Sequence, residues 1–171
     1  MRKVEIEKFS DIIILTGELF SDSRGEFVKI EIEPNWPKPD YYARSFNNLA
    51  GTFRGIHYQT DPFLEHKSVS VSSGAIIDYV VCVDKKSENF GAWTEIEISK
   101  NNLKFLHIPP GYAHGYQTLA DSTEVCYGIS GIYSKKHSRT LNYTQFNFNP
   151  KLPITSISDN DSKGESIVGS K

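Results

Sequence analysis

The sequence predicts an all-β protein built as a β-sandwich or a β-barrel. Short segments of strand-like residues dominate, and the 3.6-residue period of a helix is scarce. Turn signals such as SSG, KKSENFG, SKNN and PPG recur about every ten residues, which is typical of sandwiches and barrels rather than of βαβ units. With 171 residues, of which 38% are hydrophobic, the chain is long enough to bury the core of one domain.

The first half of the chain contains the less regular of the expected strands. An apolar run, DIIILTGELF (11–20), is followed by the turn SDSRG and the alternating segment EFVKIEIE (26–33). After NWPKPD come YYARSF (41–46), the aromatic-rich GTFRGIHYQ (51–59) and HKSVSVSSG (66–74), whose valines alternate with serines. Each of these segments ends at a cluster of turn-forming residues, which is the reason for expecting separate strands.

The second half carries clearer strand patterns. AIIDYVVCVD (75–84) is nearly all apolar, and AWTEIEIS (92–99) alternates strictly between apolar and polar residues. KFLHIPPG (104–111), HGYQTLAD (114–121) and TEVCYGISGIY (123–133) follow, separated by further turn signals. These segments complete a chain of short strands without a long helix.

The rest of the chain indicates a single domain. Residues 134–158 are less regular, which suggests a short helical or edge segment. No second domain, linker or repeat is visible, so we expect one domain over residues 1–161. The polar end of the chain, residues 162–171, is expected to form a flexible tail.

Composition narrows the class of function. The 19 basic and 21 acidic residues give a net charge of −2, which argues against a general nucleic-acid binder. Glu5 and Glu7 interrupt any signal-peptide pattern, and no window approaches a membrane span, so a cytoplasmic protein that does not bind membranes is expected. Cys82 and Cys126 lie in apolar runs without a CxxC partner, which predicts buried free thiols.

Five histidines raise the question of a metal site. Metal-binding double-stranded β-helices usually offer an H-x-H pair, because alternate residues of a strand face the same side. Tyr58 and Gln59 follow His57, so this pair is absent there, and we expect no catalytic metal. Two histidines and a carboxylate from distant strands remain an alternative that spacing does not support. The histidines are His57, His66, His107, His114 and His137.

Several side chains are candidates for chemistry, although each also has an ordinary structural interpretation. His57 can accept a proton near neutral pH. Tyr127, on an apolar strand face, is more often a core residue, and Lys67, at the start of a strand, is more often a solvated edge charge. His114 lies between Ala113 and a glycine, where a ligand can approach, but it is equally compatible with a histidine that bonds a turn carbonyl.

Taken together, the motifs resemble one enzyme family. RGIHYQ, a lysine ten positions after its histidine, IPPGYAHGYQTL, and a tyrosine thirteen positions after the second histidine occur in this order. The chain is therefore similar to the dTDP-4-dehydrorhamnose 3,5-epimerase family. The similarity extends from SDSRGEF through SFNNLAGTFRGIHYQ to ISDNDSKG and so covers almost the whole sequence.

The resemblance implies a fold and an activity. The fold is a cupin-type jelly roll, or double-stranded β-helix, that needs no metal or other cofactor and is usually a homodimer. The activity is epimerisation at C3, at C5 or at both carbons of a nucleotide-activated 4-keto-6-deoxyhexose. This reaction belongs to deoxysugar biosynthesis for surface polysaccharide.

The resemblance also assigns roles to residues. His57 matches the catalytic base, Asp161 its acidic partner, Tyr127 the general acid, and Lys67 the group beside the 4-keto oxygen. The positions that match ligand contacts around the nucleotide diphosphate and the sugar are Arg24, Lys29, Arg54, Gln59 and His114.

The chemistry independently requires such groups. Removal of a proton next to a ketone creates an enolate, so a base and a cation near the oxygen are both needed. Inversion then requires a proton from the opposite face, which a second residue must supply. Arginines suit a diphosphate, because their planar donors bind oxygens in pairs. Arg54 and His57 differ in strand parity, so Gly55 is expected to host a bulge or twist that brings both into one cavity.

The chain departs from the family pattern at several positions of the ligand-binding periphery. Lys29 stands where the family usually has Glu and Ser138 where it commonly has Glu. Asn160 stands where Lys is common and Ser70 where an Arg is frequent, whereas Arg139 is kept. These departures concern the nucleotide and the sugar rather than the reaction type. Two alternatives remain at this stage, a metal-dependent cupin isomerase or oxygenase and a non-catalytic cupin that binds sugar nucleotides.

Overall fold

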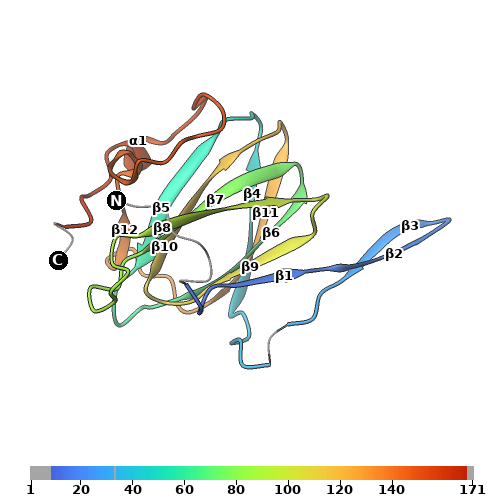
Figure 1. The fold of residues 1–171 in the computed structure, drawn as a ribbon, viewed down its shortest axis with the longest axis horizontal. Coiled ribbons are helices and arrows are strands. Elements are labelled where there is room, and N and C mark those ends of the chain that lie inside the picture. Colours follow the sequence, from blue (N-terminus) through green and yellow to red (C-terminus); the bar gives the residue numbers. More distant parts are fainter. Residues whose placement is uncertain (1–8, 33, 169–171) are drawn as a thin grey trace.

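Two five-stranded antiparallel sheets pack against each other in the computed structural model, which describes residues 9–32 and 34–168 (Figure 1). The first sheet has the order β1-β9-β6-β11-β4 and the second the order β12-β5-β10-β7-β8. This double-sheet arrangement confirms the predicted all-β jelly roll. No helix in these ranges is long and apolar enough to cross a membrane.

The strands have the following bounds. The first sheet consists of β1 (Ile13–Thr16), β9 (Lys104–Ile108), β6 (His66–Ser73), β11 (Thr123–Ser130) and β4 (Tyr41–Asn47). The second sheet consists of β12 (Ser138–Thr140), β5 (Phe53–Gln59), β10 (Tyr112–Thr118), β7 (Ala75–Cys82) and β8 (Trp93–Ser99).

A two-stranded hairpin projects from this body (Figure 1). It is formed by β2 (Glu18–Asp22) and β3 (Gly25–Lys29), which the predicted turn SDSRG connects. The expected strand 11–20 is therefore divided at Gly17, where the backbone N–H bonds the carbonyl of Leu103 and the chain leaves the first sheet. The expected strand 26–33 ends early, at Lys29.

The hydrophobic residues form two cores, one on each face of the second sheet. The first core lies between the sheets and includes Val69 of β6, Ile76 of β7 and Val125 of β11. The second core lies on the outer face of the second sheet and includes Tyr79 of β7 and Phe146. Because β7 is buried on both faces, its sequence is an apolar run instead of an alternation.

The C-terminal segment covers the outer face of the second sheet. It contains the 3₁₀ helix η2 (Tyr143–Phe146) and the short helix α1 (Asp159–Ser162), which lies beside β5 and β12 (Figure 1). The segment expected as a tail, residues 162–171, begins inside α1. Its Ile167 is 1% exposed and donates its N–H to Oε1 of Gln145, so this part of the segment packs on the body.

Candidate active site

Strand alternation directs Lys67 and Tyr127 between the two sheets. Lys67 has the same parity on β6 as Val69, and Tyr127 has the same parity on β11 as Val125. Both valines belong to the core between the sheets, so the lysine and the tyrosine face the interior of the jelly roll. Tyr127 packs against this core. The rings of Tyr127 and His114 meet edge-on, with their centroids 6.2 Å apart.

A break in alternation brings Arg54 and His57 of β5 to the same interior. Phe53 and Ile56 differ in parity, yet both belong to the outer core. The register between β5 and β10 shifts between them, and Gly55 adopts a φ of +122°. As a result, Arg54 and His57 line one cavity, which confirms the bulge expected at Gly55.

His57 forms a short hydrogen bond with a buried carboxylate. Its Nε2 lies 2.7 Å from Oδ1 of Asp161, which is 5% exposed. The other oxygen, Oδ2, accepts the backbone N–H of Gly55 at 3.2 Å. Helix α1 fixes this carboxylate, because its N-cap Ser158 accepts the backbone N–H of Asp161. The contact joins two segments that are far apart in the sequence.

The surroundings keep Asp161 ionised. Burial by itself would raise the pKa of its carboxyl, but the hydrogen bond and charge of His57, together with the N–H of Gly55, outweigh burial and lower the pKa. An ionised Asp161 holds a proton on Nε2 of His57. The other ring nitrogen, Nδ1, is then the one that can accept a proton from a substrate.

His57 and Tyr127 share a cavity of about 190 Å³. This cavity brings together residues from four strands, β4, β5, β10 and β11. Its lining residues are Ser45, Arg54, His57, His114, Gly115, Tyr116 and Tyr127. Ser45 and Tyr116, whose hydroxyl oxygens lie 2.9 Å apart, were not predicted from the sequence.

Tyr127 is kept in its protonated form. Burial raises the pKa of its phenol well above the ordinary value, and the hydrogen-bonded hydroxyl of Tyr116 and the charge of Asp78 raise this pKa further. A neutral phenol carries the proton that a general acid must donate. The environment of Tyr127 is therefore compatible with the predicted role.

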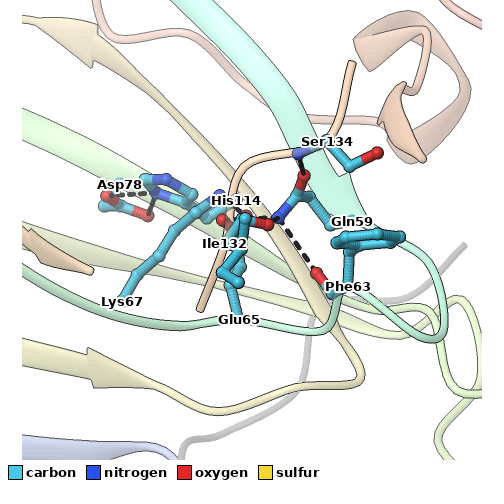
Figure 2. Close-up of polar contacts among 8 residues, drawn as sticks. All are labelled: Gln59, Phe63, Glu65, Lys67, Asp78, His114, Ile132 and Ser134. Atoms are coloured by element: carbon cyan, nitrogen blue, oxygen red, sulfur yellow. Dashed lines mark hydrogen bonds and ion pairs between the residues drawn. The ribbon is translucent and has the colours of Figure 1, made fainter. Parts of the chain in front are cut away.

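His114 is paired with a buried carboxylate that the sequence analysis missed. Its Nδ1 lies 3.1 Å from Oδ2 of Asp78, and the two residues are 5% and 0% exposed (Figure 2). Burial raises the pKa of Asp78, although His114 and Lys67 oppose the rise, and burial lowers the pKa of His114. A lone carboxylate in the apolar run AIIDYVVC was the available signal, because such a group needs a partner.

Lys67 lines a second cavity, of about 360 Å³, that also contains His57. Its Nζ lies 2.9 Å from Oε1 of Glu65, another residue that the sequence analysis missed. Since His57 lines both cavities, the structure places Lys67 and Tyr127 in two cavities on either side of this histidine. The residues that line this second cavity are Tyr41, His57, Tyr58, Gln59, Glu65, Lys67, Ile129, Tyr133, Ser138, Thr140 and Asn160.

Gln59 lies in the wall of this cavity, but its amide is engaged within the protein (Figure 2). Nε2 donates to the carbonyls of Phe63 and Ile132 and lies 3.2 Å from Oε2 of Glu65. Oε1 accepts the backbone N–H of Ser134 at 2.6 Å. Its contacts are those of a residue that holds the cavity wall together.

Arg24 and Lys29 do not line either cavity. Both belong to the projecting hairpin, where Arg24 pairs with Asp22 and Lys29 with Glu31. The side chain of Arg24 is 88% exposed. Within this one chain, the hairpin therefore contributes none of the residues around His57.

The departures from the family pattern lie in different places. Ser138 and Asn160 line the cavity of Lys67, and Nδ2 of Asn160 donates to the hydroxyl of Thr140 at 2.8 Å. Ser70 instead lines a separate cavity of about 640 Å³ that also contains Trp36. Among residues 9–32 and 34–168, no group of three or more His, Cys, Asp or Glu side chains is placed to hold a metal ion.

Comparison with known proteins agrees with the geometry. Residues 7–168 match the family model of dTDP-4-dehydrorhamnose 3,5-epimerase. The chain is 31% identical to the enzyme of that name from Shigella flexneri over 92% of each chain. It also resembles solved structures of dTDP-4-dehydrorhamnose 3,5-epimerases. The Sulfolobus tokodaii structure has a TM-score of 0.84 and 34% identity and covers 94% of this chain and 92% of its own.

A second structure of the same description, from Bacillus anthracis, was solved with TDP and PPi bound. It has a TM-score of 0.84 and 29% identity, over 92% of this chain and 95% of its own. The matched region contains the His57–Asp161 pair, Lys67 and Tyr127. This chain therefore belongs to the dTDP-4-dehydrorhamnose 3,5-epimerase family.

Proposed function

We propose that this protein epimerises a nucleotide-activated 4-keto-6-deoxyhexose at C3, at C5 or at both carbons. The observation that carries the proposal is the pairing of His57 with the ionised Asp161 at a cavity that also contains Tyr127. A base with a fixed tautomer and a protonated acid in one cavity are the two groups that inversion next to a ketone requires.

The reaction proceeds in two proton transfers. His57 takes the proton from the carbon next to the ketone, and the electron pair of the C–H bond moves toward the ketone oxygen to give an enolate. The ammonium of Lys67 donates a hydrogen bond to this oxygen and stabilises its negative charge. Tyr127 then returns a proton to the opposite face of the carbon. Solvent takes the proton from His57 and restores the proton of the phenol.

Substrate binding is assigned to groups near these residues. Arg54 lines the cavity with His57 and donates from Nε to Oδ1 of Asn47, which leaves its terminal nitrogens for a diphosphate. His114 lies on the same cavity wall, where it can contact the sugar. The structure of the Bacillus anthracis relative with TDP and PPi bound supports a ligand of this chemical class.

We also propose a homodimer. Arg24 and Lys29 match ligand contacts in the family, yet the hairpin holds them away from His57 within one chain. The hairpin also exposes 47% of Phe20 and 67% of Phe27. A second copy that covers these rings and receives the hairpin at its own cavity would account for both observations. A monomeric mass by light scattering at micromolar concentration would contradict this proposal.

The experiment that tests the activity is incubation in D2O with several nucleotide-linked 4-keto-6-deoxyhexoses. We expect deuterium at C3, C5 or both in the wild-type reaction, and the labelled carbons identify the regiochemistry. The variant His57→Asn should keep its fold and show no exchange. Full exchange in this variant would remove His57 from the mechanism, and activity that a chelator abolishes would favour the metal-dependent alternative. Binding without exchange would favour the non-catalytic cupin that binds sugar nucleotides over an enzyme.

A further inference from the structure

Glu65 and Lys67 form a buried ion pair in the wall of the cavity that contains His57 (Figure 2). Their side chains are only 10% and 12% exposed, and Oε1 of Glu65 lies 2.9 Å from Nζ of Lys67. Most other ion pairs in the described part of the chain, such as Lys151 with Glu95, include a much more exposed partner. An ion pair this well shielded from water has a more definite geometry than a surface pair.

Both carboxylate oxygens of Glu65 are engaged. Oε1 faces Lys67, and Oε2 faces Nε2 of Gln59 at 3.2 Å. Gln59 is in turn held by the backbone of Phe63, Ile132 and Ser134, as described above. Glu65 thus has no unengaged oxygen with which to exchange a proton with a substrate, but it is well supported as an anchor.

The backbone around the pair is closely packed. Glu65 lies immediately before β6, the central strand of the first sheet, in which Lys67 is paired with Ile108 and Ile129. A Cβ atom at Gly131 would lie 3.1 Å from the Cα of Glu65, so the two segments are in contact. The backbone of Glu65 and of Lys67 is therefore held in place by the sheet and its adjoining loop.

Building on the proposed function, we propose that Glu65 is the positioning residue for Lys67. It fixes the ammonium group before substrate binds, at the place where the ketone oxygen becomes negatively charged. A lysine has a flexible four-carbon stem, and an ammonium has three donors, so one bond to Glu65 leaves two for the substrate. A donor that is already oriented requires no rearrangement as the enolate forms.

The variant Glu65→Gln tests this role. Its single amide oxygen cannot face both Lys67 and Gln59, and its NH2 group would meet a donor on one side. We expect kcat for deuterium exchange to fall by about 10- to 100-fold, the range for a displaced catalytic group. KM should change by less than about threefold, because the diphosphate is bound elsewhere. Glu95→Gln, which removes another Glu–Lys pair outside the cavity, is the matched control and should keep wild-type kcat.

A double-mutant comparison separates positioning from a general structural effect. If Glu65 acts through Lys67, Glu65→Gln should have almost no effect on the residual exchange of a Lys67→Met enzyme. An equal loss in both backgrounds, or an unchanged kcat in Glu65→Gln alone, would overturn the proposal. If Glu65→Gln fails to fold, Glu65→Asp replaces it; this variant keeps the charge, and an intermediate loss of kcat is expected.

A measurement without substrate distinguishes this proposal from the proposed function. A fixed, shielded ammonium gives a slowly exchanging ¹H–¹⁵N signal, which the Lys67→Met variant identifies by its disappearance. We expect Glu65→Gln to lose this signal and Glu95→Gln to retain it. A wild-type protein that shows the signal but exchanges no 4-keto sugar would refute the proposed function and leave the anchoring of Lys67 supported. A signal unaffected by Glu65→Gln would refute the anchoring itself.

Discussion

The substitution Asp161→Asn provides a specific test of the His57–Asp161 pair. Oδ2 of Asp161 accepts the N–H of Gly55, so the amide oxygen of an asparagine is required at that position. The NH2 group then faces Nε2 of His57, which must become an acceptor and place its proton on Nδ1. The variant therefore keeps the hydrogen bonds but presents the wrong tautomer to the substrate.

The expected loss of activity follows from two effects. A hydrogen bond to a charged group stabilises it by about 1.5–3 kcal/mol. Loss of this stabilisation from the imidazolium that forms corresponds to a decrease in rate of roughly 10- to 150-fold. The wrong tautomer adds to this loss, and in a comparable His–Asp pair the combined effect reaches about 10⁴-fold. We expect kcat for deuterium exchange to fall by about 10²- to 10⁴-fold, less than the complete loss in His57→Asn.

The assay compares wild type, Asp161→Asn and the control Asp159→Asn. Asp159 lies on the same short helix, but its side chain is 95% exposed, so its loss should leave exchange unchanged. Thermal unfolding should show that both variants are folded. Exchange at the wild-type rate in Asp161→Asn would show that the carboxylate does not set the tautomer of His57, and our interpretation of the pair would be wrong.

Three further predictions follow from the same geometry. Tyr127→Phe should retain deuterium exchange but lose about 10²- to 10⁴-fold of the inverted product, and equal losses of both would exclude Tyr127 as the acid. The pKa of Asp161 is lowered in the folded protein, so its carboxylate stabilises the fold above the unfolded pKa of about 4, and this contribution is lost as pH falls through the folded pKa. Urea unfolding should therefore show that the free energy of unfolding falls more steeply below about pH 5 in wild type than in Asp161→Asn. Gly55→Ala should lower the unfolding midpoint more than Gly25→Ala, since both glycines have positive φ but only a Cβ at Gly55 meets another backbone, 2.5 Å from the Cα of Gly115; equal midpoints would contradict this packing.

Much of the fold was predictable because alternation and turn residues are local signals. The edge strand β8 (Trp93–Ser99) and the central strands β6 and β7 appear close to their predicted bounds. Helix α1 was not predicted, since four residues are too short to show a helical period. The hairpin of β2 and β3 projects from the body because neither sheet of this chain covers it. The residues of the hairpin alone do not indicate this.

The candidate site was predictable where a residue belongs to a family motif, as Asp161 does, and unpredictable for partners that lie outside these motifs. His57 and Lys67 stand in recognisable sequence contexts, whereas Asp78 and Glu65 become significant only through their contacts with His114 and Lys67. The register of β7 and β10 places His114 opposite Val80, two residues from Asp78, and such long-range contacts cannot be derived from alternation.

The residues proposed for proton transfer and the residues that depart from the family pattern lie in different parts of the fold. The proposed proton-transfer residues, His57 and Tyr127, extend from strands of the two sheets into their interior, where close packing restricts any change. Ser138 and Asn160, which depart from the family pattern, lie on the short edge strand β12 and on helix α1, and Lys29 lies on the projecting hairpin. We propose that these three positions contact the nucleotide sugar, so that substitutions there alter binding without moving His57 or Tyr127. Substitution of Lys29, Ser138 or Asn160 should therefore change KM for different nucleotide sugars. The sugar carbon that takes up deuterium in D2O should stay the same.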